Sequence, residues 1–589
     1  MVILLSLSLF SACDLFSFER TACTTNEDCD KAFGKGSICI SSATQNTDST
    51  EDTEQGYCST CETNEDCQDA YGNGAMCAAR TAREALFDFE EEPKYCEVEL
   101  TPDVRCSESI PADIWNDWES YSDAVIIGQM FKGKDDRSKT TATKLAIEQI
   151  QEIQGDDERL FVSVLCNYST ASDAGFDDGL SETAVVKAIA DHLVDDFGAN
   201  VIIGPSNSSA SLTAIEHLDG RAVLISPSAT SEDLSNRQQA NAENDEAPMF
   251  WRTVPSDKYQ SAVLIQLIKQ KEQQAKDAAE ATGNVHTTKI GVLYTDEVYG
   301  LGILEALEEA LGDELVEGFK FDEETTLETL ESIIQGAENT AFEDVTSILS
   351  VVSGVDDLKT VINIILDHNS SSSKDASLLY FFTDSAARSE VFTTNIRQKI
   401  SDNPEIIERI WGTRPAILED ASHFSNFNSD FEKRFTEALG ETYDPTSPYK
   451  YDAKNNIFAA FSYDAMWLGI LGSLWAQTNG NETAEGISLG MSSFTALGRQ
   501  TPLRSTEWGF FKEEFLEERA LNIQGCSGDL DFNPTTKRIE AKIEIWSIDE
   551  NSQQIIADEC SFSLGDQRQG DADFIGSLVC EELVIETEE

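Results

Sequence analysis

From about residue 120 onward, short apolar runs alternate with segments whose apolar residues recur every three or four positions. Runs of the first kind predict buried strands, and the second spacing predicts amphipathic helices. Strands that alternate with helices form parallel sheets with helices on both faces. We expect strands at 123–130, 159–166, 200–204, 222–226, 289–295, 315–321, 345–352, 377–383 and 409–413.

The number of strands divides the chain into two lobes, because about nine are too many for one doubly wound sheet. The segment MFWRTVPSDKYQ at 249–260 would be the first crossing between the lobes. After residue 413 the alternation gives way to a long apolar helix at 455–477 and a final strand pair. We therefore predict an α/β fold of two doubly wound parallel-sheet lobes with a ligand cleft between them. Lobe 1 would comprise 121–253 and 414–503, and lobe 2 would comprise 254–413 and 504–589 with a C-terminal extension.

The N-terminus has the pattern of an export signal. Residues 2–12, VILLSLSLFSA, are an apolar run too short to span a bilayer, and small residues end it just before Cys13. The run FSAC at 10–13 resembles a bacterial lipobox, in which the cysteine is lipidated and becomes the mature N-terminus. No Lys or Arg precedes the apolar run, which departs from that pattern. We predict a signal peptide at 1–12, lipidation at Cys13 and an anchored linker at 13–22.

Cysteines are concentrated near the N-terminus, in two copies of the spacing C-x5-C-x9-C-x18-C. Dense cysteines in short modules are typical of disulfide scaffolds in oxidising compartments. Zinc sites use closer cysteine pairs, so disulfides are the favoured interpretation and metal binding is the alternative. The pairing within each module stays open, because four cysteines allow three connectivities. We predict small disulfide-rich modules at 23–58 and 61–96, followed by a linker at 97–120.

The charge balance excludes some partners. The chain has 108 acidic and 42 basic residues, a net charge of −66, spread along its length. Such a surface disfavours nucleic acid and anionic membrane surfaces as partners, and favours a soluble exterior.

Two small, hydroxyl-rich loops follow predicted strands of lobe 1. They are GPSNSSA at 204–210 and SPSAT at 226–230. In open α/β sheets, ligands bind beyond the carboxyl ends of strands, near helix N-termini whose N–H groups attract anions. Serines at these places are also common helix caps. The loops therefore admit either a capping role or contact with a carboxylate.

The series of segments resembles the type I periplasmic binding proteins, closest to the branched-chain amino-acid binding proteins of ABC importers. The resemblance covers roughly residues 120–550. It is carried by NVIIGPSNSSASLTAI, AVLISPSATSEDLS, FWRTVPSDKYQSAVLIQLI, KIGVLYTDEVYGLGILEALEEAL, FAAFSYDAMWLG and GDLDFNPTTKRIEAKIEIWSI. It implies two α/β lobes that are joined by three crossovers and close on a small ligand.

The resemblance also implies a set of binding residues. Ser208, with Ala229 and Thr230, would hold an α-carboxylate, and Ser228 precedes that pair in the same loop. Tyr299, in the motif YG-x-G, would close over the ligand, and Asp384 would meet its ammonium group. Hydroxyl and N–H donors for a carboxylate, a carboxylate for an ammonium and an aromatic lid form a consistent chemistry.

The first loop of lobe 1 departs from the family. It lacks the usual Gly-Pro turn and carries Lys132, Lys134 and Arg137, which would either help to bind an anionic ligand or form a solvated surface.

The cysteine pattern departs as well. Asn207 stands where some relatives have a disulfide cysteine, so Cys166 could pair with Cys106 instead. Of the five cysteines outside Cys13 and the modules, one would be free unless the pairing differs, and two of Cys526, Cys560 and Cys580 would form a bridge.

No catalytic or metal-binding motif stands out. The five histidines are scattered, and no HExxH, G-x-S-x-G or GxxxxGK[ST] pattern occurs. We therefore expect neither an enzyme nor a cofactor or metal site. The expected function is that of a lipid-anchored solute-binding protein of the periplasm or cell envelope. It would capture an amino acid or similar ligand for an ABC permease in the inner membrane. The alternative is an envelope lipoprotein of the same fold that regulates or senses other envelope proteins, which the N-terminal modules favour slightly.

Overall fold

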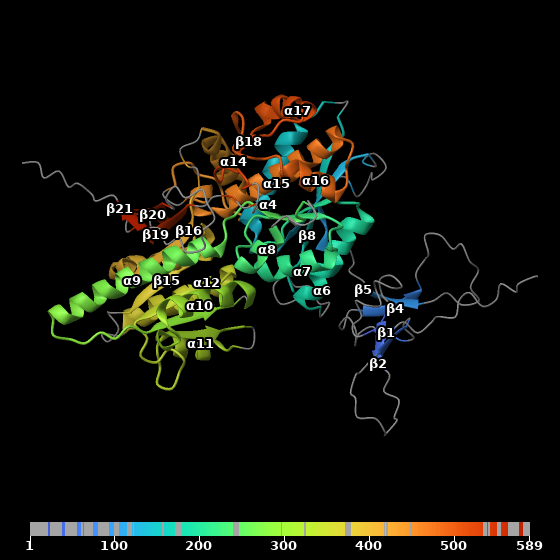
Figure 1. The fold of residues 1–589 in the computed structure, drawn as a ribbon. Helices are drawn as coiled ribbons and strands as arrows, with labels where there is room; N and C mark the ends of the chain where they lie inside the picture. The colour runs from blue at the N-terminus through green and yellow to red at the C-terminus, as the bar shows by residue number, and fades with distance from the viewer. Residues whose placement is uncertain are drawn as a thin grey trace, which may run out of the picture. The chain divides into compact units, whose positions relative to one another are not determined.

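A computed structural model of the chain describes residues 105–549, with short gaps, and isolated strands near both ends of the chain (Figure 1). The chain forms two compact units, Met1–Val104 with Thr170–Ala188, and Arg105–Ser169 with Ile189–Glu589. The expected signal peptide and Cys13 lie outside the described residues. The gaps fall at 113, 115–120, 122, 156–157, 171–179, 239–246, 296, 323–324, 372–377, 418, 420–421, 448–449, 534–536, 538 and 540–541.

The N-terminal unit contains two small antiparallel sheets, one for each copy of the cysteine repeat. The third and fourth cysteines of each copy lie opposite each other in register, Cys39 with Cys58 and Cys77 with Cys96. The two copies therefore share the same strand pairing, and their disulfides stay a prediction. The strands are β1 (Ala22–Cys23), β2 (Ile38–Ser41), β3 (Gly56–Ser59), β4 (Ala75–Ala79) and β5 (Lys94–Val98).

The first lobe is built on a six-stranded sheet of order β11-β10-β9-β7-β8-β6, parallel except for its edge strand β6. Its inner strands are continuous apolar runs, as expected for a sheet that is buried on both faces. The three-residue β6 lies within the stretch 97–120 that the sequence analysis assigned to a linker. The strands are β6 (Glu108–Ile110), β7 (Val125–Phe131), β8 (Phe161–Asn167), β9 (Val201–Ile203), β10 (Val223–Ser226) and β11 (Phe250–Arg252).

Helix α15 (Phe458–Thr478) is the centre of the first lobe's core. It is apolar on all sides and almost entirely buried, as a helix enclosed by other elements must be. With α4 (Arg137–Gln151) it covers one face of the sheet, and α7 (Ser208–Leu218) lies on the other side (Figure 1). Gly469 lets α15 approach β9 closely, because a Cβ there would lie 3.1 Å from Val201 and Ile203.

The second lobe is built on an eight-stranded sheet of order β13-β12-β14-β15-β16-β19-β20-β21. Strands up to β16 are parallel, and the last three are antiparallel, so both sheets are mixed rather than purely parallel. The last two strands place Cys560 opposite Cys580. The strands are β12 (Ile290–Tyr294), β13 (Val316–Lys320), β14 (Ser347–Val351), β15 (Leu379–Phe382), β16 (Ile410–Pro415), β19 (Ile543–Ile548), β20 (Ile555–Ser563) and β21 (Ser577–Cys580).

Helices bury both faces of the second sheet. One apolar core contains α9 and α10, and the other contains α11, α12 and α13. The nine strands and the doubly wound architecture predicted from the sequence are therefore confirmed. These helices are α9 (Asp257–Ala281), α10 (Glu297–Leu311), α11 (Leu327–Ile334), α12 (Val355–Ser371) and α13 (Thr394–Asp402). The remaining helices of eight or more residues are α6 (Glu182–Asp191), α14 (Ser422–Ala438), α16 (Ala484–Met491) and α17 (Trp508–Leu516).

The chain passes three times between the lobes, after β11, after β16 and before β19. Buried Arg414, near the end of β16, connects the second and third of these passages through hydrogen bonds. It donates to Glu544 on β19 at 2.5 Å and to the Lys454 carbonyl at 2.7 Å. Buried apolar residues between Leu503 and Ile539 pack into the core of the first lobe. The short strands β17 (Gln500–Pro502) and β18 (Asn522–Gln524) pair with each other in this part of the chain. The sequence analysis assigned 504–589 to the second lobe; in this stretch, β19, β20 and β21 are the strands that join the second sheet.

One disulfide suggested by the sequence is present in the second unit, and a bridge between Cys560 and Cys580 stays a prediction. Cys106 and Cys166 form a disulfide between the segment before β6 and strand β8. Cys526 is buried and free. The disulfide links the segment before the edge strand β6 to its neighbour in the sheet, β8.

Among the described residues, no helix is both long and apolar enough to cross a membrane.

Candidate ligand-binding site

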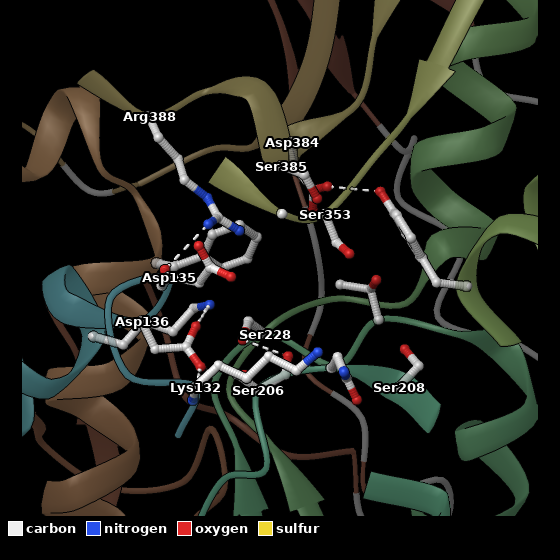
Figure 2. Close-up of a pocket in the computed structure, with 16 residues that line it drawn as sticks. Lys132, Asp135, Asp136, Ser206, Ser208, Ser228, Ser353, Asp384, Ser385 and Arg388 are labelled. Carbon is white, nitrogen blue, oxygen red and sulfur yellow. Dashed lines mark hydrogen bonds and ion pairs between the residues drawn. The ribbon is translucent and has the colours of Figure 1, made fainter. Parts of the chain in front are cut away.

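A pocket lies where the strands of both sheets end, and side chains of both lobes line it (Figure 2). The space between these residues, including its opening to solvent, is about 570 Å³. The loops after β7, β9 and β10 line it from one lobe and those after β12, β14 and β15 from the other. The lining residues are Lys132, Asp135, Asp136, Lys139, Ser206, Asn207, Ser208, Ser228, Thr230, Tyr299, Ser353, Gly354, Asp384, Ser385, Arg388 and Phe458.

The loop after β9 needs a glycine at its start. Gly204 has φ +103°, and a Cβ there would lie 2.2 Å from the Met130 carbonyl oxygen of β7. Only glycine accepts both this backbone conformation and this close approach. The turn delivers Asn207 as the cap of α7, whose side chain accepts from the Ala210 N–H at 2.7 Å. Ser208 is thereby fixed as the first residue of the helix.

Ser208 presents a hydroxyl to the pocket from the N-terminus of α7. It is 3% exposed, and its oxygen accepts from the Ser231 N–H at 3.2 Å. This bond orients the hydroxyl and leaves its hydrogen to be donated. The partial positive charge of the helix N-terminus also favours an anion here. The arrangement suits a carboxylate.

The loop after β10 is bonded to the loop after β9. The Ser228 hydroxyl donates to the Ser206 carbonyl at 2.7 Å, and the Ser226 hydroxyl donates to the Pro205 carbonyl at 2.6 Å. Thr230 lines the pocket. Ala229 is fully buried, does not line the pocket and gives its N–H to Ser226 at 3.0 Å. The Ser228 hydroxyl is therefore used within the protein, and Ala229 shapes the loop.

The second lobe contributes Tyr299 and Asp384, which bond to each other. The Tyr299 hydroxyl donates to Asp384 Oδ1 at 2.9 Å, and Oδ2 has no hydrogen-bond partner in the described part of the chain. Burial raises the pKa of Asp384, although the Tyr299 hydroxyl and Arg388 work against that rise. Burial also raises the pKa of Tyr299 well above its usual value, with a further contribution from Asp384. A buried carboxylate oxygen without a partner is suited to accept a ligand ammonium.

A second buried carboxyl lies near Asp384. Asp257 is the first residue of α9, and neither of its carboxyl oxygens finds a partner among the described residues. Burial and the charge of Asp384 raise the pKa of Asp257 well above its usual value. The charge of Asp384 thus disfavours the ionisation of Asp257.

The basic loop predicted from the sequence divides between the pocket and the surface. Lys132 lines the pocket, whereas Lys134 pairs with Asp356 of the other lobe at 2.5 Å in an exposed position. Arg137 begins α4 and does not line the pocket. The loop therefore contributes one cation to the pocket and one exposed contact between the lobes.

Sequence reasoning missed the cationic groups on α4 and after β15. Lys139 is 3% exposed and pairs with buried Asp136 at 2.5 Å. Asp136 also accepts the Ser206 hydroxyl and the Lys132 N–H, and the partners together hold its pKa below the usual value although burial opposes this. Arg388 lies four residues after Asp384 and lines the same pocket. In the sequence, only its place just after a strand end pointed to it.

The structure brings together Ser208, Ser228, Thr230, Tyr299 and Asp384 in one pocket, and it leaves Ala229 beneath the surface. Donors for a carboxylate lie on the first lobe, and an acceptor for an ammonium lies on the second. The pocket can thus hold a small molecule with both groups between the lobes.

The chain resembles several known proteins. A family model described as receptor family ligand binding region matches residues 139–551. Solved structures that resemble the chain include the branched-chain amino-acid transporter substrate-binding protein LivJ from Streptococcus pneumoniae in complex with isoleucine. The identity is 16%, with 74% of this chain and 99% of that chain covered and a TM-score of 0.47.

Two further structures have similar values. The leucine-binding protein LivK from Thermotoga maritima is 15% identical, with 74% of this chain and 98% of that chain covered and a TM-score of 0.47. The third is a solute-binding protein of an ABC transporter from R. palustris in complex with 4-hydroxybenzoate. Its identity is 13%, with 74% of this chain and 95% of that chain covered and a TM-score of 0.47. No curated protein sequence matches the chain significantly.

Proposed function

Because the chain belongs to the family of receptor ligand-binding regions, which has the type I periplasmic-binding fold, we propose that it is a solute-binding protein. It captures a small molecule with a carboxylate and an ammonium group, an α-amino acid or a close relative, between its two lobes. The ligand leaves unchanged and passes to an ABC permease. Cys13 carries the lipid that holds the protein at the cell envelope.

One observation carries the proposal. Ser208 of the first lobe and Asp384 of the second line the same pocket, one with a hydroxyl hydrogen to donate and the other with an unpartnered carboxylate oxygen. A ligand that bonds to both holds the lobes together, because neither lobe alone supplies both partners. Ligand binding then shifts the equilibrium between open and closed lobes toward the closed state, because the ligand binds that state better.

Replacing Ser208 by alanine should weaken binding of the captured amino acid by about 10-fold or more, because a hydrogen bond to a charged group contributes about 1.5–3 kcal/mol. Calorimetric titration of the full-length protein with individual L-amino acids measures this loss. Ser401→Ala, at an exposed position of α13, is the matched control and should bind as the wild type does. Equal affinity of wild type and Ser208→Ala would remove Ser208 from the site. Failure of every amino acid to bind would favour the regulatory alternative, and a protein partner would then be sought.

A further inference from the structure

The pocket contains a buried cation for which the described residues provide no ion pair. Arg388 is 6% exposed, and its Nη1 donates to the backbone carbonyl of Asp135 at 3.3 Å. In the part of the chain that the structure describes, its buried Nε has no hydrogen-bond partner, and no carboxylate forms an ion pair with the guanidinium. Figure 2 shows the guanidinium pointing from the second lobe across the pocket toward Asp135. A buried charge without an opposite charge is costly unless something else supplies one.

The neighbouring charges do not supply it. Asp136 is fully engaged with Lys139, Ser206 and the Lys132 N–H. Asp384 gives Oδ1 to Tyr299, and Glu390 is buried with neither carboxylate oxygen bonded to a described residue. Arg388 favours the ionised forms of both Asp384 and Glu390, but burial raises the pKa of each. Asp135 lines the pocket beside Arg388 and acts electrostatically on Lys139. Several carboxyl groups therefore lie near the guanidinium, but among the described residues none of them forms an ion pair with it.

Further positive charge gathers at this end of the pocket. Lys132 and Lys139 line it with Arg388, in a chain that has only 42 basic residues and a net charge of −66. Like charge from Arg388 works with burial to lower the pKa of Lys139, and Asp136 opposes that change. The pocket lining also contains Asp135, Asp136 and Asp384, and Lys139 is already paired with Asp136. Arg388 is therefore the cation at this end that is suited to an anion of the ligand.

We propose that Arg388 receives a second acidic group of the ligand, so that the captured solute is an acidic α-amino acid with a carboxylate on its side chain. This rests on the proposed function, which assigns the α-carboxylate to Ser208 and the ammonium to Asp384. The planar guanidinium can bond a carboxylate through two parallel N–H donors, and its Nε is one of them. Lys132 adds positive charge at the same end. An uncharged amide in that place would leave the buried guanidinium without an opposite charge.

Paired ligands of equal size test the inference. The full-length protein is titrated calorimetrically with L-glutamate and L-glutamine, and with L-aspartate and L-asparagine. We expect one of the acids to bind at least about 30-fold more tightly than its amide, as the loss of a charged hydrogen-bond partner predicts. Arg388→Gln should remove that preference by weakening the acid and leaving the amide unchanged, and Arg388→Lys should retain part of it. If Arg388→Gln does not fold, the wild-type comparison and Arg388→Lys still decide the matter.

Four results would overturn the inference. The first is an amide that binds as tightly as its acid, and the second is an Arg388→Gln variant that weakens acid and amide equally, which would assign the guanidinium to the α-carboxylate. The third is no binding by any of the four compounds. The fourth is tight binding of L-leucine with binding of neither L-glutamate nor L-aspartate, which would leave the proposed function standing. Glutarate binding as tightly as L-glutamate would support the anion site and contradict the ammonium role in the proposed function.

Discussion

Replacement of Asp384 by asparagine should weaken the binding of an α-amino acid by about 30-fold or more. Removal of one member of a buried, hydrogen-bonded charge pair costs about 2–5 kcal/mol. Asp384 is 2% exposed, and its free Oδ2 is the only unpartnered carboxylate oxygen among the described residues that line the pocket from the second lobe. Calorimetric titration measures the loss directly. The variant should fold, because burial already disfavours the charge that the substitution removes.

The deaminated analogue of the same ligand provides the control. It lacks the ammonium group, so wild type and Asp384→Asn should bind it with similar affinity. Asp402→Asn, at an exposed position of α13, should leave amino-acid binding unchanged. Because burial raises the pKa of Asp384, amino-acid affinity in the wild type should fall as the pH is lowered through that pKa, and the variant should lose this dependence. Equal losses for the amino acid and its deaminated analogue would contradict the ammonium role.

As the pH rises from 4 to 8, the free energy of unfolding of the first lobe should fall by about 4 kcal/mol because of one side chain, Asp464. Burial raises the pKa of Asp464 to about 7, although Ser527 and the Cys526 N–H favour the ionised form. Its oxygens accept the Cys526 N–H at 2.9 Å and the Ser527 N–H at 2.8 Å. A folded pKa above the unfolded value means that the folded state binds the extra proton. The stabilisation is complete below about pH 4 and is lost as the pH rises through 7.

Chemical unfolding of wild type and Asp464→Asn at several pH values isolates this effect. The other acidic residues are common to both proteins, so the difference between the two curves reports Asp464 alone. We expect the wild type to lose about 3 kcal/mol more than the variant between pH 5 and pH 9. Parallel curves would show that Asp464 keeps an ordinary pKa. The effect bears on binding because α15, which carries Asp464, packs behind β9 and thus behind the loop that holds Ser208.

The fold could be predicted from the sequence because its strands are continuous apolar runs. Segments such as NVIIG and KIGVLYT become β9 and β12, which are buried on both faces. Such strands differ clearly from the amphipathic helices between them. The three-residue β6 was missed because it is too short to show a period and is fixed by pairing with β8 and by the nearby Cys106–Cys166 disulfide. Between Leu503 and Ile539 the chain belongs to the core of the first lobe because its apolar residues share that core with α15. A contact between segments so far apart in the sequence has no local sequence pattern, so it could not be predicted.

The candidate site could be predicted in part. Five of its expected residues follow strand ends, and strand ends of parallel sheets meet at one edge. Ala229 was misplaced because the resemblance carries a position and not the direction in which the residue faces. Arg388 could not be identified from sequence, since its significance depends on which acids lie close enough to pair with it. Asp136 and Lys139 form a pair that a sequence of alternating charges does not distinguish from a solvated surface.

Thermal unfolding of the full-length protein against a panel of α-amino acids and their deaminated analogues tests the central claim most directly. A ligand at 100 times its dissociation constant adds about 2.7 kcal/mol to the stability of the folded state, enough for a clear upward shift. The account predicts such a shift with at least one α-amino acid, a much smaller one with its deaminated analogue, and loss of the shift in Ser208→Ala and Asp384→Asn. No shift with any compound, or equal shifts with and without the ammonium group, would contradict it.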